Sequence, residues 1–289
     1  MTIWDLDTFI QLALEEDIRS GDITSLACIA PDSVSLARLK VKDDGVLAGV
    51  GFARKLVQYV GNQLELEVFI DDGAYVQYGD IAFELNGPSR TLLSIERLLL
   101  NTMQRMSGIA TLSDRFASEV SGLPVKILDT RKTSPCFRAL EKWAVRIGGC
   151  YNYRDGLYDW FMIKDNHIAA SGSISRAIKK VNQYQQDKGL SGYGITIEVK
   201  NLIEIEEVLK NGGVTRIMMD NFEIPLLSEG VAMIGKRFET EASGGISLQN
   251  VRQVAMTGVD YISVGALTHS AGSLDLSLKI QEHTPRQDK

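Results

Sequence analysis

The chain has 289 residues, of which 44% are hydrophobic and 24% are charged, a composition typical of a globular protein with two domains or one large one. Its formal net charge of −6 argues against a nucleic-acid surface, because such domains usually carry a clustered basic excess. The chain does not open on a basic segment followed by an apolar run, and no run of about 18 apolar residues predicts a membrane span, so we expect a cytoplasmic protein that does not bind membranes.

Residues 1–107 combine helical and strand patterns. A first helix is predicted near the start, where either Asp5 or Asp7 can cap it. A longer helix is predicted from about Ser89 to Val120, with Gly108 as a candidate interruption. Strands separated by glycine turns are predicted at residues 34–42, 64–70 and 74–85.

The rest of the chain alternates short β-rich runs with amphipathic helices, which is typical of a parallel α/β sheet. One helix is predicted at Asn201–Leu209 with Asn201 as its cap, and another at Ser247–Thr257 with Ser247 as its cap. The predicted strands are Val125–Leu128, Trp160–Ile163, Gly194–Val199, Thr215–Met219, Phe238–Ala242 and Tyr261–Val264.

Polar residues and glycines stand at or directly after the ends of these six runs. Because the loops at the C-terminal strand ends of a β/α barrel converge on one mouth, we expect these residues to meet at one rim. Six runs in roughly 170 residues fall short of the eight strands in about 250 residues of a complete barrel, so we expect an open or irregular one. The residues concerned are 129–132, 164–167, Glu198, 220–221, 243–245 and 265–269.

Residues 126–164 carry eight basic and four acidic side chains within an acidic chain, which favours a small, highly anionic ligand. Arginine in particular can bind a carboxylate or phosphate through two parallel hydrogen bonds. A solvated helix face is the alternative for Lys142 and Arg146, which lie four residues apart. The basic residues at the predicted rim are Arg131, Lys132, Arg154 and Lys164.

Two further groups at the rim suit a phosphorylated sugar. Glu198 and Asp220 end neighbouring strand runs, and paired carboxylates can hold Mg²⁺ or accept hydrogen bonds from sugar hydroxyls, or merely neutralise the basic cluster. Residues 243–245 and Gly265 leave backbone N–H groups open to a phosphate, and the first stretch precedes the predicted helix cap at Ser247. Tight turns between strand and helix also use glycine, so that alternative stays open.

Histidines and cysteines give no metal-binding pattern. His167 and His269 lack H-E-x-x-H spacing, and for His167 a structural role is an alternative to catalysis. The three cysteines include no C-x-x-C pair, so we expect small buried thiols rather than disulfides or a zinc site.

Five segments of this half of the chain resemble, in order, those of quinolinate phosphoribosyltransferases, and matches at Glu15, 21–24 and Glu96–Arg97 extend the resemblance over nearly the whole chain. The resemblance implies an N-terminal α/β sandwich at residues 1–107, onto which residues 276–289 pack back. It implies an open TIM-like α/β barrel at residues 108–275. The five segments are Leu128–Thr133, Ile163–His167, Met219–Asn221, Ser243–Ser247 and Val264–His269.

The activity that the resemblance implies is transfer of ribose 5-phosphate from phosphoribosyl pyrophosphate to the ring nitrogen of quinolinate. Loss of the 2-carboxylate as CO₂ then gives nicotinate mononucleotide, a precursor of NAD. The resemblance also implies Mg²⁺ as cofactor, with Glu198 and Asp220 serving both the ion and the ribose hydroxyls. It implies a homodimer, or a hexamer built as a trimer of dimers, in which Arg97 reaches the neighbouring site.

Individual residue roles are likewise implied by the resemblance. The residues that it places on the two quinolinate carboxylates are Arg131, Lys132 and Arg154, and it gives Thr130 and Tyr153 as further substrate-binding residues. The residues that it places around the 5-phosphate are Ser243, Gly244, Gly265 and His269. The catalytic residues that it implies are Lys132, Lys164, Glu198 and Asp220, of which Lys164 contacts the sugar donor.

One departure concerns the substrate site, because Tyr153 stands where the family has a substrate-facing histidine. A phenol can donate one hydrogen bond but carries no positive charge near pH 7, so carboxylate binding is expected to weaken or rearrange.

Three other functions are open to a sequence of this kind. A related transferase for another carboxylated pyridine is disfavoured by the intact run 164–167. A Schiff-base aldolase using Lys164 would need that lysine to lack an acidic partner. A non-catalytic protein that kept the fold would have lost charged site residues, whereas here only Tyr153 departs at a position expected to contact the substrate.

Overall fold

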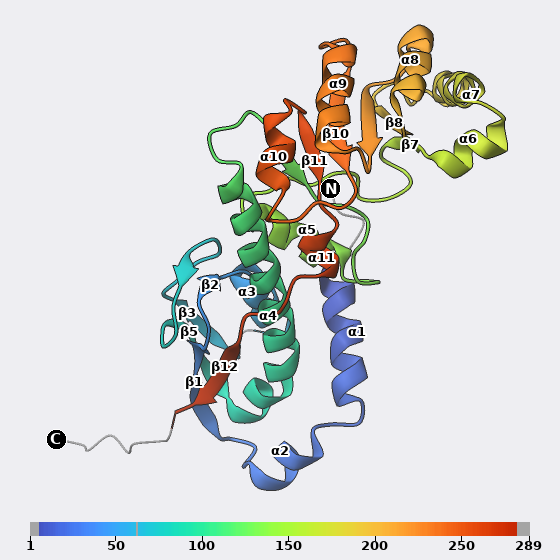
Figure 1. Cartoon of the computed structure of the whole chain (residues 1–289). Helices are drawn as coiled ribbons and strands as arrows, with labels where there is room; N and C mark the ends of the chain where they lie inside the picture. The colour runs from blue at the N-terminus through green and yellow to red at the C-terminus, as the bar shows by residue number, and fades with distance from the viewer. Residues whose placement is uncertain (1–5, 62, 282–289) are drawn as a thin grey trace. The chain divides into compact units, whose positions relative to one another are not determined.

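The computed structural model describes residues 6–61 and 63–281, which fold into two units (Figure 1). The first unit combines three stretches of the chain, namely the part up to Asp114, residues 134–149 and the part from Ala271. The second unit consists of residues 115–133 and 150–270. The domain boundaries expected after residues 107 and 275 stay predictions.

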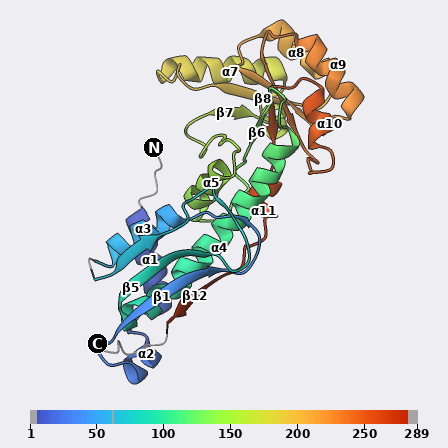
Figure 2. The same cartoon turned by 90° about the vertical axis from the view of Figure 1, so that its left-hand side faces the viewer.

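The first unit is built on an antiparallel sheet with the strand order β12-β1-β5-β3 (Figure 2). Residues two apart on β1 face its core, since Ala37, Leu39 and Val41 are fully buried. The last described strand, β12, pairs with β1 so that Leu276 lies opposite Val41. Residues 282–289 of the C-terminal segment lie outside the described residues. The strands are β1 (Val34–Val41), β3 (Glu65–Val68), β5 (Ile81–Pro88) and β12 (Leu276–Ile280), with a separate pair of β2 (Gly45–Val46) and β4 (Tyr75–Val76).

Two sequence expectations for this unit, one about a helix and one about a strand, are corrected by the structure. Helix α4 runs unbroken through Gly108, where a Cβ atom would lie 2.0 Å from the carbonyl oxygen of Gly272, so this glycine permits a close backbone approach. The strand expected at 74–85 is divided by a turn at residues 77–80. The first helix exists, although Asp5 lies outside the described residues. The helices are α1 (Leu6–Ile18), α2 (Ile23–Cys28), α3 (Val50–Tyr59), α4 (Ser89–Glu119, ending in the second unit) and α5 (Arg138–Ile147).

The second unit contains a six-stranded parallel sheet with the order β6-β11-β10-β9-β8-β7. All six predicted strand runs are therefore confirmed. Within the described residues β6 and β7 form the two edges and do not pair with each other, which confirms an open rather than a complete barrel. Fully buried residues such as Ile197, Ile217 and Ile262 form its core. The strands are β6 (Lys126–Leu128), β7 (Phe161–Ile163), β8 (Ile195–Val199), β9 (Arg216–Asp220), β10 (Glu239–Ser243) and β11 (Tyr261–Ser263).

Helices alternate with these strands, and one predicted cap is right while the other is wrong. Asn201 Oδ1 accepts the backbone N–H of Glu204 at 2.9 Å and caps α8 as expected. Helix α10 begins only at Val251, because Asn250 Oδ1 accepts the backbone N–H of Ser247 at 2.8 Å and closes a turn before the helix. Across the described part of the chain, no helix is long and apolar enough to cross a membrane. The helices are α6 (Asp165–Ser171), α7 (Ile174–Asp187), α8 (Leu202–Asn211), α9 (Ile224–Ile234), α10 (Val251–Met256) and α11 (Ala266–His269).

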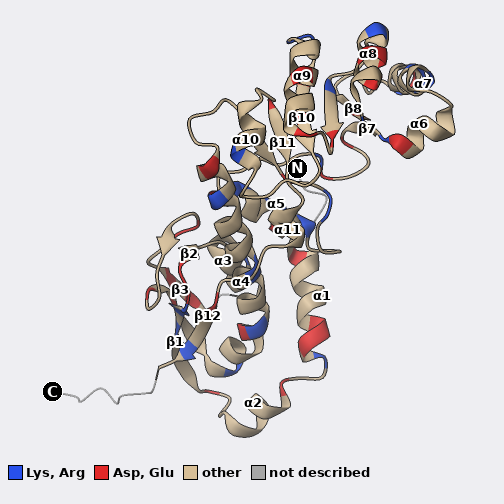
Figure 3. Cartoon of the chain, viewed as in Figure 1, with Lys and Arg blue, Asp and Glu red and all other residues tan. Residues whose placement is uncertain are grey.

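The basic segment at residues 126–164 is divided between the two units, since residues 134–149 belong to the first unit and their neighbours to the second. Basic and acidic residues are interspersed along the elements of both units (Figure 3). Lys142 is 2% exposed, so the solvated-helix interpretation is wrong for its side chain. The expectation of buried thiols holds for Cys150 but is wrong for Cys28 and Cys136, which are exposed.

Candidate active site

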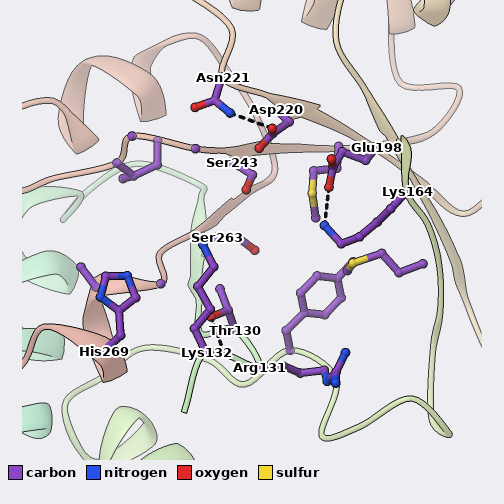
Figure 4. Close-up of a pocket in the computed structure, with 18 of the residues that line it drawn as sticks. Thr130, Arg131, Lys132, Lys164, Glu198, Asp220, Asn221, Ser243, Ser263 and His269 are labelled. Carbon is purple, nitrogen blue, oxygen red and sulfur yellow. Dashed lines mark hydrogen bonds and ion pairs between the residues drawn. The ribbon is translucent and has the colours of Figure 1, made fainter. Parts of the chain in front are cut away.

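A pocket of about 670 Å³ lies at the carboxyl ends of the parallel strands in the second unit (Figure 4). All predicted site residues except Arg97 line it, so the fold brings together side chains that are far apart in the sequence. Met162, Met218 and Ser263 line it as well and were not anticipated. Arg97 is exposed on α4, with Nη1 3.4 Å from Asn101 Oδ1.

Strand pairing explains why the acidic and hydroxyl side chains converge. Asp220 and Ser243 end β9 and β10 and lie opposite each other in the ladder, and Glu198 on β8 lies opposite Met218 on β9. Because residues two apart on a strand share a face, Met218 and Asp220 point the same way. The neighbouring positions on β8, β9 and β10 therefore project into one pocket (Figure 4).

Arg131 and Arg154 line the pocket without an ion pair to any described residue. Arg131 Nε is buried and makes no hydrogen bond with the described residues. Burial first, and then the positive charge of Arg131, lower the pKa of Arg154 below the usual value for arginine. In the described part of the chain neither guanidinium forms an ion pair. An anionic ligand would satisfy the buried donor and offset the repulsion between the two side chains.

The two lysines of the site are held differently. Lys164 Nζ, just after β7, contacts the carboxylate of Glu198 (Figure 4), which contradicts the aldolase alternative because that mechanism needs a lysine without an acidic partner. Lys132 is exposed, but its backbone is fixed. Its N–H donates to Thr130 Oγ1 at 3.1 Å, and its carbonyl oxygen accepts a hydrogen bond from Thr268 Oγ1 at 2.8 Å.

The carboxylates of Glu198 and Asp220 do not form a complete metal site by themselves. Asp220 Oδ2 accepts a hydrogen bond from Asn221 Nδ2 at 2.7 Å, and Glu198 is paired with Lys164. Among the residues that the structure describes, no cluster of three or more His, Cys, Asp or Glu side chains could hold a metal ion. Two adjacent carboxylates nevertheless fit Mg²⁺, which commonly takes one or two protein carboxylates and completes its shell with water and substrate phosphates.

Glycines keep space open where His269 and Lys132 lie (Figure 4). At Gly265 a Cβ atom would lie 3.0 Å from His269 Nε2 and 3.1 Å from Lys132 Cδ. Gly244 has a φ of +89°, and a Cβ atom there would lie 2.3 Å from Asn221 Oδ1. The absence of a Cβ atom therefore lets Asn221 lie close to Gly244, and His269 and Lys132 close to Gly265, within the pocket. Helix α10 begins too far along the chain for its N-terminus to hold a phosphate as expected.

The two rim histidines differ in position. His167 Nδ1 accepts the backbone N–H of Lys164 at 2.9 Å at the start of α6, and His167 does not line the pocket, which favours the structural alternative. His269 lines the pocket and is exposed, and its Nδ1 lies 2.6 Å from Ser270 Oγ.

A buried polar network beside the pocket was missed by the sequence reasoning. Glu241 on β10 is fully buried and accepts hydrogen bonds from Ser263 Oγ and, at 3.1 Å, from Arg216 Nη1. Burial raises the pKa of Glu241, and the charge of Arg216 opposes that rise. The hydroxyl of Tyr153 lies 2.6 Å from Thr196 Oγ1. No motif marks these residues, although charged residues within otherwise buried strands are a signal that could have located Arg216 and Glu241.

Comparison with known proteins identifies relatives of both halves of the chain. A family model described as quinolinate phosphoribosyl transferase, N-terminal domain, matches residues 22–107. The model described as quinolinate phosphoribosyl transferase, C-terminal domain, matches residues 109–279.

Individual relatives align over nearly the full length. A quinolinate phosphoribosyltransferase (decarboxylating) 1b of Nicotiana tabacum is 44% identical over 292 residues, covering 96% of this chain and 83% of that protein. A probable nicotinate-nucleotide pyrophosphorylase (carboxylating) of Bacillus subtilis (strain 168) is 41% identical and covers 92% of this chain and 90% of its own length. The crystal structure of nicotinate-nucleotide pyrophosphorylase from Ehrlichia chaffeensis superposes with a TM-score of 0.89 at 35% identity, covering 97% of this chain and all of that one.

Proposed function

The chain belongs to the quinolinate phosphoribosyltransferase family, and from this membership we propose that it converts quinolinate and phosphoribosyl pyrophosphate to nicotinate mononucleotide, pyrophosphate and CO₂. This is the decarboxylating transferase step of de novo NAD biosynthesis. The activity is supported by two relatives named for this reaction, which are more than 40% identical to this chain over more than nine-tenths of its length.

The observation that carries the choice of substrate is the pair of unpaired arginines. Quinolinate presents two carboxylates on adjacent ring atoms, and Arg131 and Arg154 supply two guanidinium groups that form no ion pair with the described residues. The buried Nε of Arg131 needs an acceptor that the described protein does not provide. A dicarboxylate supplies enough acceptor oxygens for both guanidinium groups.

The acidic side of the pocket suits the sugar donor. As the bond from the anomeric carbon to pyrophosphate breaks, positive charge develops on the ribose, and the carboxylates of Glu198 and Asp220 stabilise it while accepting hydrogen bonds from the ribose hydroxyls. Lys164 orients Glu198 and offsets the negative charge of the departing pyrophosphate, while Lys132 helps to bind a quinolinate carboxylate. Ser243, by this proposal, helps to hold the 5-phosphate at the glycine-lined end of the pocket.

The ring nitrogen of quinolinate forms the new bond to the anomeric carbon with its lone pair, and the pyrophosphate leaves with the electrons of the broken bond. The nitrogen then carries a positive charge. When the neighbouring 2-carboxylate leaves as CO₂, the charged ring stabilises the electron pair left on carbon, which then takes a proton. No side chain needs to act as a nucleophile, so the protein contributes orientation and electrostatics.

Phosphoribosyltransferases generally use a divalent metal ion, and we propose Mg²⁺ here. Glu198 and Asp220 are the residues that would hold it, with pyrophosphate oxygens and water as the other ligands. The bound ion would neutralise charge on the leaving pyrophosphate.

Arg97 is proposed to act at the active site of a neighbouring subunit. It does not line the pocket of its own chain, yet the family resemblance places it at a substrate site, so we propose a homodimer or a hexamer of three dimers in which it reaches a neighbouring pocket. Mixing inactive Arg97→Ala with inactive Lys132→Ala would give hybrid dimers with one intact site, and activity should reappear. Persistent inactivity of a verified hybrid would contradict the shared site.

The decisive test is release of labelled CO₂ from 2-carboxyl-labelled quinolinate with phosphoribosyl pyrophosphate and Mg²⁺. We expect release that depends on the sugar donor. Consumption of nicotinate without CO₂ release would instead identify the related transferase. If neither quinolinate nor nicotinate reacted, a non-catalytic protein would be favoured. A cytoplasmic location stays a prediction that cell fractionation would test.

A further inference from the structure

Tyr153, the residue that departs from the family pattern, lies between two cavities. It lines the substrate pocket, and it also lines a second hollow of about 280 Å³ together with Trp160 and Arg216. The Arg216 guanidinium lies 5.1 Å from the centre of the Tyr153 ring. The orientation of this one side chain therefore shapes the boundary of the substrate pocket.

A hydrogen bond to Thr196 holds the Tyr153 hydroxyl. Trp160 Nε1, which can only donate, is 2.9 Å from Thr196 Oγ1, so the threonine accepts there. The Tyr153 hydroxyl lies 2.6 Å from the same threonine oxygen, and either of these two hydroxyls can donate in that hydrogen bond. The buried carboxylate of Glu241 lies nearby on β10 and accepts a hydrogen bond from Arg216.

The backbone beside Tyr153 is fixed as well. Asp129 is fully buried, and its Oδ1 accepts the Tyr153 N–H at 2.9 Å while its Oδ2 accepts Asn152 Nδ2 at 2.5 Å. Arg154 follows directly in the chain and lines the same two cavities as Tyr153. Fixing the ring and the backbone of Tyr153 thereby fixes the base of the Arg154 side chain.

We propose that Tyr153 is a positioning residue, an inference that rests on the proposed function. Thr196 holds its hydroxyl, Arg216 packs over its ring, the ring forms part of the pocket wall, and this arrangement orients Arg154 toward a quinolinate carboxylate. The Tyr153 hydroxyl is engaged by Thr196 rather than by the substrate. Tyr153 thus stands where the family has a substrate-facing histidine, and it acts on the substrate through Arg154.

The test compares Tyr153→Phe, Thr196→Val and the double variant. Each single change breaks the same hydrogen bond, so each should raise the quinolinate KM by a similar factor, about three- to tenfold for one lost hydrogen bond, with a smaller effect on kcat. The rise in KM for the double variant should be smaller than the product of the two single effects, because the Tyr153–Thr196 hydrogen bond can be lost only once. The KM for phosphoribosyl pyrophosphate should stay within about twofold of wild type.

Thr215→Val is a matched control, because Thr215 Oγ1 accepts a backbone hydrogen bond from Ile195 at 2.9 Å but Thr215 does not line the pocket. Thermal melts of all variants separate loss of fold from loss of positioning, and Thr215→Val should change the melting temperature without changing the KM.

Two results would overturn the proposal. A rise in KM for Tyr153→Phe that Thr196→Val does not share would indicate direct donation to the substrate, and unchanged KM values in both variants would exclude positioning. Quinolinate affinity is measured by calorimetry alongside turnover, so a wild-type protein that binds but releases no CO₂ would count against the proposed function and still permit the comparison.

Discussion

Replacing Arg131 with methionine should separate the activity of this protein from its stability. Methionine keeps an unbranched apolar side chain of similar length but removes the guanidinium, including the buried Nε without a partner. If that guanidinium binds a carboxylate through two charged hydrogen bonds, each worth about 1.5–3 kcal/mol, its loss costs at least about 3 kcal/mol of binding to quinolinate. This corresponds to a fall in kcat/KM of about 100-fold or more.

The same change should make the free protein more stable. A buried donor without a partner costs about 1–3 kcal/mol, and Arg131 also repels Arg154. Because Arg131 is only half-buried, we take the lower end of this range, and a gain of about 1 kcal/mol corresponds to a rise of about 2–4 °C in melting temperature.

The assay is release of labelled CO₂ at varied quinolinate concentration, paired with thermal unfolding in the absence of substrates. Arg54→Met is a suitable control, because Arg54 is an exposed arginine of the first unit that pairs with Asp71 at 3.4 Å, and it should alter neither measurement appreciably. If Arg131→Met were destabilised together with its loss of activity, Arg131 would be structural and the reasoning from its unpaired donor would be refuted.

The other predictions follow from single contacts. Lys132→Ala should abolish quinolinate binding by calorimetry and leave the melting temperature nearly unchanged, because Lys132 is exposed; retained binding would exclude its role. Gly244→Ala should raise the KM for phosphoribosyl pyrophosphate, because its Cβ would displace Asn221, and an unchanged KM would argue against a phosphate there. Glu141→Ala should lower the free energy of unfolding in urea by about 3 kcal/mol, because fully buried Glu141 accepts Arg105 Nη2 at 2.9 Å; a loss below about 1 kcal/mol would contradict this. Chelation with EDTA should stop CO₂ release and added Mg²⁺ should restore it, whereas EDTA-resistant turnover would exclude the metal.

The parallel sheet could be predicted because each strand is a short apolar run that ends in a polar or glycine residue. The same feature located the pocket, since Asp220 and Ser243 end neighbouring strands and their positions were visible in the chain. Sequence patterns gave a wrong local structure where a contact with a residue far away in the sequence determines it. The sequence suggests that Gly108 interrupts a helix. In the structure the carbonyl oxygen of Gly272 packs against Gly108, and this contact between residues far apart in the sequence explains the glycine.

The cap of α10 was mispredicted because serine and asparagine compete for the same backbone groups. Ser247 and Asn250 both suit a helix start, and the structure selects a turn closed by the asparagine. The environment of Tyr153 could not be predicted, because Thr196, Arg216 and Glu241 come from three different strands and no short motif connects them.

The pairing of β12 with β1 has a consequence for biosynthesis. The edge of β1 at Ala37–Val41 receives its partner only when residues 276–280 have left the ribosome, whereas the strands of the second unit have all been synthesised by then. The strands of the second unit are therefore synthesised before the first sheet receives the strand that covers the β1 edge. A nascent chain arrested before Leu276 should expose that edge to other molecules, and a chaperone that covers sheet edges would be most useful to this protein at that moment.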